Sequence, residues 1–75
     1  MARNIYDVSP NGEKWTVKKR GATFASGTFD RKADAIEHGK TVAKANQPSQ
    51  LVIHKADGTF ETEYMYGNDP YPPPG

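Results

Sequence analysis

The chain has 75 residues, which is enough for one small domain. Ten basic and nine acidic residues give a net charge of +1, so only an uneven charge distribution would favour nucleic-acid binding. Because the chain contains no cysteine, a disulfide framework and a cysteine-based metal site are excluded. No run approaches the ~20 apolar residues of a membrane-spanning helix, and the first four residues lead into a strand-like segment rather than a signal peptide. We therefore expect a soluble, cytoplasmic protein.

The N-terminal part of the chain predicts three short strands. Residues 5–8 are β-prone, and a Pro-Asn-Gly turn separates them from residues 14–20. In residues 14–20 apolar and polar side chains alternate, so that Trp15 and Val17 point to one side of the strand. Residues 23–29 predict a third strand before the chain turns into a helix.

A helix is predicted over residues 30–47. Asp30 is a candidate N-cap, because its carboxylate can accept hydrogen bonds from the first free N–H groups of the helix. Asn46 and Pro48 mark the end of the helix. Gly39 costs about 1 kcal/mol of helix propensity relative to Ala, which suggests that the helix approaches the sheet closely at this point. Helical spacing places one small apolar stripe on a single side: Ala35, Ile36, Gly39, Val42 and Ala43.

The C-terminal part predicts a second pair of strands. Residues 51–53 are apolar on both faces, as in a central strand, and an Asp-Gly turn leads to an alternating strand at residues 60–66. Residues 68–75 are rich in proline and predict an extended, flexible tail that joins no sheet. Residues 1–67 are thus expected to form the single compact domain.

The predicted fold class is α+β, with a small, mostly antiparallel sheet of four or five strands and one helix on one face (β-β-β-α-β-β). Either Leu51 and Ile53 or Val52 faces the helix, depending on the register. The helix is expected to pack on Trp15, Val17, Phe29, Leu51 or Ile53, and Phe60. A small core needs several large side chains, and the expected aromatic core residues are Tyr6, Trp15, Phe24, Phe29, Phe60 and Tyr64, with Tyr66 exposed.

Several of these residues resemble a known family. They are the run Trp15–Lys18, the pair Gly21–Ala22, Phe29, Ala35 in the helix, Leu51–His54, the Asp57–Gly58 turn and Tyr66–Gly67. Together they resemble the small bacterial domain numbered 2188 in the domain-of-unknown-function series, over roughly residues 5–67. The resemblance implies a compact α+β domain and no activity, so no catalytic residues are carried over.

The residues themselves give little support to an enzyme. Asp34 and His38 are four apart on the predicted helix and share a side, while His54 lies in the fourth predicted strand. A metal site would require the histidines to converge with carboxylates, and no phosphate loop or nucleophile motif is present. A domain of this size is also not expected to contain a deep pocket of ~300 Å³ or more, which small-molecule sites usually need. We predict a non-enzymatic protein with no catalytic, cofactor-binding or metal-binding residues.

A basic face is the most specific alternative. If the helix covers the Trp15 side of the sheet, the opposite side is open, and basic side chains there can contact phosphates while a hydroxyl reads a base edge. The candidate nucleic-acid-binding residues are Lys14, Thr16, Lys18, Arg20, Arg31 and Lys32. The competing interpretation is that these charges keep an exposed face soluble and pair with Glu61 and Glu63 across the sheet.

The leading interpretation is a protein-binding or accessory module that acts on an unidentified protein partner. The segment Ile5–Val8 carries no residue that would block pairing with another strand if it lay at the edge of the sheet. Because a small core also gains stability from association, a homodimer is a further hypothesis. The segment Pro70–Pro74 offers a further docking element, with a disordered end as the alternative.

Overall fold

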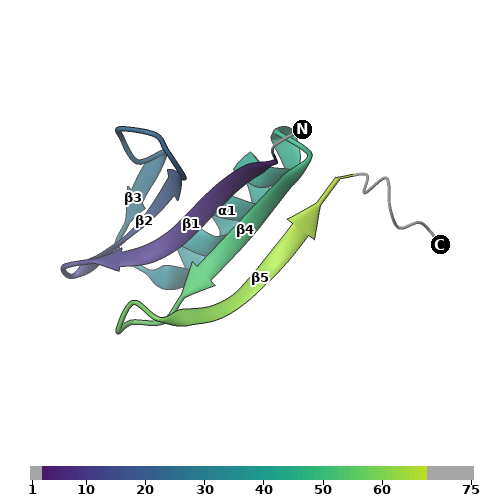
Figure 1. The fold of residues 1–75 in the computed structure, drawn as a ribbon. Coiled ribbons are helices and arrows are strands. Elements are labelled where there is room, and N and C mark those ends of the chain that lie inside the picture. The colour runs from purple at the N-terminus through teal and green to yellow at the C-terminus, as the bar shows by residue number, and fades with distance from the viewer. Residues whose placement is uncertain (1–2, 68–75) are drawn as a thin grey trace.

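The computed structural model describes residues 3–67, and its elements follow the predicted order. The strands are β1 (Asn4–Asn11), β2 (Lys14–Lys19), β3 (Gly27–Phe29), β4 (Ser49–His54) and β5 (Phe60–Tyr66), and helix α1 spans Lys32–Ala45 (Figure 1). The predicted α+β class, with one helix against a mostly antiparallel sheet, is confirmed for this part of the chain. The predicted tail at 68–75 lies outside the described residues. Within residues 3–67 no helix is both long enough and apolar enough to cross a membrane.

The five strands form one mixed sheet in the order β3-β2-β1-β4-β5. β1 and β4 pair in parallel, and the other neighbouring strands pair antiparallel. The prediction that Ile5–Val8 presents an exposed edge is wrong, because β1 lies in the middle of the sheet between β2 and β4. The reason is that α1 carries the chain back across the sheet, and a crossover of this length permits a parallel partner.

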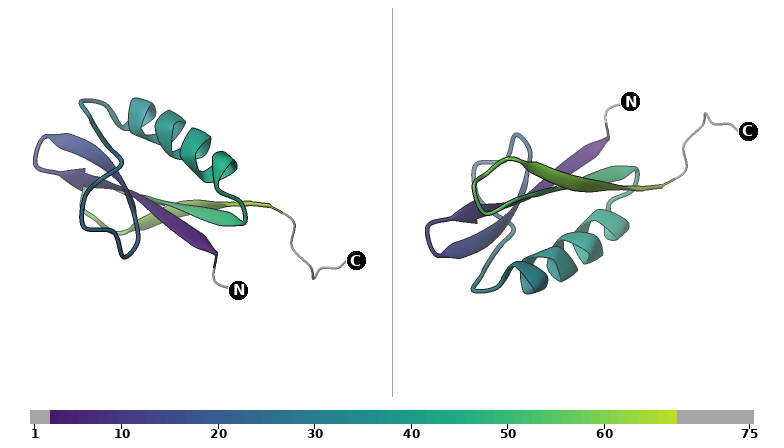
Figure 2. Two further views of the ribbon diagram at one scale, coloured as in Figure 1. Left: turned by 90° about the horizontal axis from the view of Figure 1, so that it is seen from above. Right: turned by 90° about the horizontal axis from the view of Figure 1, so that it is seen from below.

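Helix α1 packs on one face of the sheet and leaves the other face uncovered (Figure 2). Leu51 and Ile53 face the helix and are 0% and 1% exposed, which resolves the register that the sequence left open. They form the core with Tyr6, Val8, Val17, Ala35 and Ala43. The apolar stripe predicted for the helix therefore supplies the buried side of α1, with Ile36 and Val42 packed around the core.

The close approach predicted at Gly39 is confirmed. A Cβ atom at this position would lie 2.8 Å from Leu51 Cδ1 and 3.3 Å from Val8 Cγ2. The side chains that use this space are therefore Val8 and Leu51 of the two central strands. The cost of glycine in a helix is offset by tighter packing over the middle of the sheet.

The start of the helix differs from the prediction. The N-cap residue is Arg31, which makes no side-chain capping hydrogen bond, so the assignment of Asp30 as N-cap is wrong. The Asp30 carboxylate instead accepts a hydrogen bond from Lys14 Nζ. The helix is also shorter than the predicted 30–47, since it begins at Lys32 and ends at Ala45.

The aromatic residues divide differently between core and surface than expected. Tyr6 is buried, and Trp15 and Phe29 are half-buried against the core, as is Tyr66, for which exposure was predicted. The prediction is wrong for three residues: Phe24 is 82% exposed, Phe60 56% and Tyr64 41%. Phe24 lies in the loop before β3, which is shorter than predicted, and the other two lie on β5, which has no strand on its outer side.

Candidate interaction face

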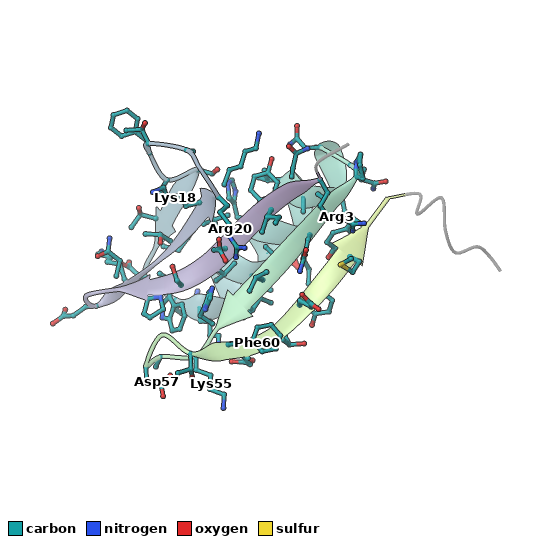
Figure 3. All side chains as sticks on the ribbon, in the orientation of Figure 1. Arg3, Lys18, Arg20, Lys55, Asp57 and Phe60 are labelled. Atoms are coloured by element: carbon teal, nitrogen blue, oxygen red, sulfur yellow. The ribbon has the colours of Figure 1, made fainter. Side chains whose placement is uncertain are left out.

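The candidate site is the uncovered face of the sheet, here called the open face (Figure 3). Side chains alternate along each strand, and paired residues of neighbouring strands project to the same side. Val8, Val17 and Leu51 face the helix, so the residues next to each of them along its strand face outward. By this register the open face comprises Ile5, Asp7, Ser9, Asn11, Lys14, Thr16, Lys18, Thr28, Gln50, Val52, His54, Phe60, Glu63 and Met65, with Arg20 just beyond β2.

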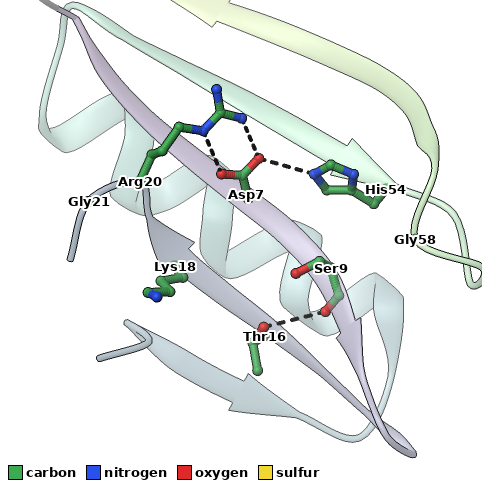
Figure 4. Close-up of a pocket in the computed structure, with 8 residues that line it drawn as sticks. All are labelled: Asp7, Ser9, Thr16, Lys18, Arg20, Gly21, His54 and Gly58. Carbon is green, nitrogen blue, oxygen red and sulfur yellow. Dashed lines mark hydrogen bonds and ion pairs between the residues drawn. The ribbon is translucent and has the colours of Figure 1, made fainter. Parts of the chain in front are cut away.

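A shallow depression of about 450 Å³ lies on this face. It is lined by Asp7, Ser9, Thr16, Lys18, Arg20, Gly21, His54 and Gly58 (Figure 4). Polar side chains from three strands stand around the floor of the depression, and the glycines at its rim, Gly21 and Gly58, have no side chains that would fill it.

Asp7 is the centre of a hydrogen-bonded cluster in the depression. Arg20 donates to both carboxylate oxygens, from Nη2 to Oδ1 at 2.8 Å and from Nε to Oδ2 at 3.1 Å. His54 Nε2 lies 3.0 Å from the same Oδ1. Burial raises the pKa of Asp7, but the hydrogen bonds from Arg20 and His54 outweigh it and hold the pKa below the ordinary 3.8. The carboxylate is therefore ionised near neutral pH, and His54 Nε2 is the donor to it.

The two histidines have other roles than the ones considered from the sequence. His54 Nδ1 is buried and makes no hydrogen bond to any of the described residues, so neither ring nitrogen of His54 is free to meet a ligand. The ring of His38 packs against Phe29 with centroids 5.1 Å apart, while Asp34 pairs with Arg31 at 3.3 Å. Asp34 and His38 therefore do not act as a pair. Residues 3–67 contain no cluster of three or more His, Asp or Glu side chains placed to hold a metal ion.

The six residues predicted to bind nucleic acid do not form one surface. Thr16, Lys18 and Arg20 line the depression, and Lys14 lies on the same strand. In contrast, Lys32 lies on the helix side, with its Nζ 5.1 Å from the centroid of the Trp15 ring, and the exposed Arg31 precedes α1.

The charges of these residues are also compensated differently than predicted. Lys14 pairs with Asp30, Arg20 with Asp7, and Arg31 with Asp34. Glu61 does pair, but with Lys32 of the helix. The interpretation that the basic set pairs with Glu61 and Glu63 therefore holds for Lys32 alone, and the basic residues of β2 do not take part because β1 and β4 separate β5 from β2. Within the described part of the chain, Lys18 is the member of the set without an acidic partner.

An apolar patch lies next to the depression, on the β4–β5 side of the open face. Val52 is only 7% exposed although the helix is on the opposite face, while Phe60 and Met65 are each 56% exposed. Arg3 Nη1 lies 3.6 Å from the Met65 sulfur at the edge of this patch. The open face is thus charged over β2, and over β4 and β5 it carries apolar side chains interspersed with Gln50, His54 and Glu63.

Sequence reasoning missed Asp7, Ser9 and His54 as members of the site. Asp7 and Ser9 come from β1 and His54 from β4, so the cluster depends on the parallel pairing of those two strands. The sequence did contain a signal for Asp7. It lies between the apolar residues Tyr6 and Val8, so the alternation of a strand places its side chain on the outward face.

The comparisons with known proteins yield one match. The family model described as an uncharacterised protein conserved in bacteria (DUF2188) matches residues 6–66, which include α1, β2 to β5, β1 from Tyr6 onward and the whole cluster around Asp7. No curated protein matches the chain, and no solved structure does. The description of the matching family gives no activity.

Proposed function

The chain belongs to the bacterial DUF2188 family, and we propose that it is a non-enzymatic interaction module that binds a partner protein through its open face. The observation that carries this proposal is the uncovered face itself, which joins an apolar patch to an uncompensated cation. Aromatic residues and Met are enriched at protein interfaces, and both occur in the patch as Phe60 and Met65.

The charges of the open face define the chemistry of the partner. Arg20 is engaged by Asp7, so Lys18 provides the net positive charge over β2. Over β5 the carboxylate of Glu63 accepts a hydrogen bond from the neutral Gln50 amide and keeps its negative charge. The partner that fits presents an acidic side chain to Lys18 and apolar side chains to the patch around Val52.

The alternative partner is a nucleic acid. Binding to a phosphate backbone requires several cations that are free to neutralise phosphates. Four of the five candidate cations already pair with carboxylates of the described residues, and Lys32 lies on the opposite side of the sheet. This distribution favours a protein partner over a nucleic acid.

The cluster around Asp7 suits a structural role better than a catalytic one. A general acid or base must present a titrating atom within hydrogen-bond reach of a substrate. His54 points Nε2 at Asp7 and buries Nδ1, and the Asp7 carboxylate is occupied by Arg20. These contacts hold β1, β2 and β4 in register beneath the open face.

Site-specific photocrosslinking tests the proposal. A photoreactive amino acid replaces Thr16 on the open face in one variant and Glu37 on the solvent side of α1 in the other, in the full chain in cell lysate. We expect discrete adducts from position 16 and none of the same mass from position 37. Adding Lys18→Glu to the position-16 variant should remove the adducts, because it reverses the charge that faces the acidic partner.

The same experiment distinguishes the alternative. Nuclease treatment and 0.5 M salt should leave a protein adduct in place, whereas a nucleic-acid adduct is sensitive to nuclease and forms far less at high salt. Identical adducts from positions 16 and 37, or adducts that survive Lys18→Glu, contradict the proposed face.

A further inference from the structure

We infer that Asn11 is a site of spontaneous chemical modification, at which the side-chain amide is lost and aspartate and isoaspartate form. Asn11 is the last residue of β1, and Gly12 follows it in the short loop that joins β1 to β2 at one tip of the molecule (Figure 1). The inference rests on the geometry of this loop and does not depend on the proposed function.

The reaction needs water and base but no cofactor. Base removes the proton of the Gly12 amide, and the nitrogen attacks Cγ of Asn11. An N–Cγ bond forms, the Cγ–Nδ2 bond breaks, and ammonia leaves a succinimide ring behind. Water then opens the ring: cleavage of the N–Cγ bond gives aspartate, and cleavage between the nitrogen and the main-chain carbonyl carbon gives isoaspartate. The structure must therefore offer an unhindered nitrogen and a side-chain amide that is free to turn towards it.

Among the asparagines of residues 3–67, Asn11 is the one whose side chain is free. It is exposed and makes no hydrogen bond within this part of the chain. The side-chain amides of Asn4 and Asn46, in contrast, donate to main-chain carbonyl oxygens at 2.7 Å and 2.8 Å. Both are also followed by residues with long side chains, which hinder attack by the nitrogen, whereas Gly12 has no side chain.

The attacking nitrogen is free as well. The N–H of Gly12 has no main-chain acceptor among the described residues, and a Cβ atom placed on Gly12 would meet no other atom within 4 Å. Base and water can therefore reach this amide, and no packed side chain resists closure of the ring.

The loop between β4 and β5 contains a comparable pair, Asp57–Gly58, but there both reacting groups are held. The Gly58 N–H donates to the Lys55 carbonyl oxygen at 2.8 Å. Asp57 Oδ1 accepts hydrogen bonds from the hydroxyl and the amide of Thr59, at 2.6 Å and 3.0 Å. These bonds hold the pKa of Asp57 below the ordinary 3.8, so the group is a carboxylate at neutral pH and a poor electrophile. We expect the first loop to react and the second to be protected.

The modification changes both the charge of the chain and the β1–β2 hairpin. Either product adds one acid to the nine present, which then equal the ten basic residues and bring the net charge from +1 to zero. Isoaspartate also inserts a methylene into the main chain at the position where Asn11 pairs with Lys14. It should therefore loosen the end of the hairpin more than aspartate does.

Peptide mapping of the aged full chain tests the inference. The folded chain is kept at pH 8 in ¹⁸O-labelled water and then cut with trypsin, which leaves Asn4 and Asn11 together in the peptide of residues 4–14. We expect loss of the amide and uptake of one ¹⁸O atom at Asn11, as separable aspartate and isoaspartate peptides, with Asn4 unchanged. Asn11→Gln should give no such product, because glutamine would have to close a larger ring.

Thr59→Val tests the protection of the second loop. In the folded natural chain we expect no isoaspartate at position 57, whereas it should form there once the chain is unfolded in urea. Thr59→Val removes one of the hydrogen bonds to Asp57 and should speed isoaspartate formation in the folded chain about tenfold. If the folded chain keeps the Asn11 amide while a synthetic peptide of residues 4–14 loses it, the inference is overturned. Equal formation at positions 11 and 57 of the folded natural chain also overturns it.

Discussion

The two faces of the sheet are built from the same strands and have opposite roles. On the helix face Val17 and Leu51 are fully buried, and Gly39 lets α1 approach Leu51 closely. On the open face their chain neighbours, Lys18 and Val52, lie in a depression or a patch that no element covers. The comparison shows that alternation along a strand places one residue in the core and the next on the face that we propose binds a partner.

The largest expected difference between the faces is at adjacent residues of β4. Leu51→Ala leaves a cavity beneath Gly39 and should lower the free energy of unfolding by about 3–4 kcal/mol. Val52→Thr, on the open face, should cost about 1 kcal/mol, because threonine has nearly the volume of valine and leaves no cavity. Urea unfolding of both variants measures the difference, and equal losses contradict the division between the two faces.

The helix offers a similar contrast at two positions. Gly39→Val places a branched side chain against Leu51 and should cost about 2 kcal/mol through overpacking. Glu37→Val, on the solvent side of the same helix, should change stability by no more than about 0.5 kcal/mol. Because valine has a higher helix propensity than glycine, a loss in thermal unfolding of Gly39→Val arises from the close approach, and an unchanged stability of that variant would contradict it.

On the open face the expected effect is smaller and depends on pH. The folded-state pKa of Asp7 lies below the ordinary 3.8, so its stabilisation is present above that value and is lost as the pH falls through the folded-state pKa. Asp7→Asn should therefore cost about 1 kcal/mol at pH 7, since the Arg20 partner is largely exposed, and progressively less below about pH 4. Urea unfolding between pH 7 and pH 2 measures this convergence.

Ser9→Ala, at the same depression, is the matched control for Asp7→Asn. It removes no titrating group, so its stability curve should run parallel to that of the natural chain over the whole pH range. Parallel curves for Asp7→Asn itself would contradict the role assigned to its ionised carboxylate.

The smallest effect is expected at the exposed ion pairs. The side chains of Lys14 and Asp30 are 56% and 79% exposed, and those of Arg31 and Asp34 are 80% and 52% exposed. Lys14→Gln and Arg31→Gln should each change the free energy of unfolding by less than about 0.5 kcal/mol, because water and salt screen such pairs. A loss above about 1 kcal/mol in thermal unfolding at 0.15 M salt would assign these pairs a structural role.

Much of the fold was predictable from patterns that operate over a few residues. The alternation around Trp15, the turns that join β1 to β2 and β4 to β5, and the small stripe around Gly39 indicated the element order and the side of the helix that packs. The prediction failed where a local signal admitted two outcomes. Asp30 resembles an N-cap but lies close enough to Lys14 to pair with it instead, and Phe24 lies in a loop where a strand was predicted.

By itself, the sequence determined which side chains alternate, where the chain turns and which side of the helix is apolar, because these depend on neighbours one to four residues away. Only the tertiary structure decided that β1 is central and that β5 is an edge. It also decided that Asp7 meets both Arg20 and His54, which is 47 positions further along the chain. The physical reason is that parallel pairing of β1 with β4 depends on how the helix docks on the sheet, a long-range choice that leaves no periodic mark in the sequence.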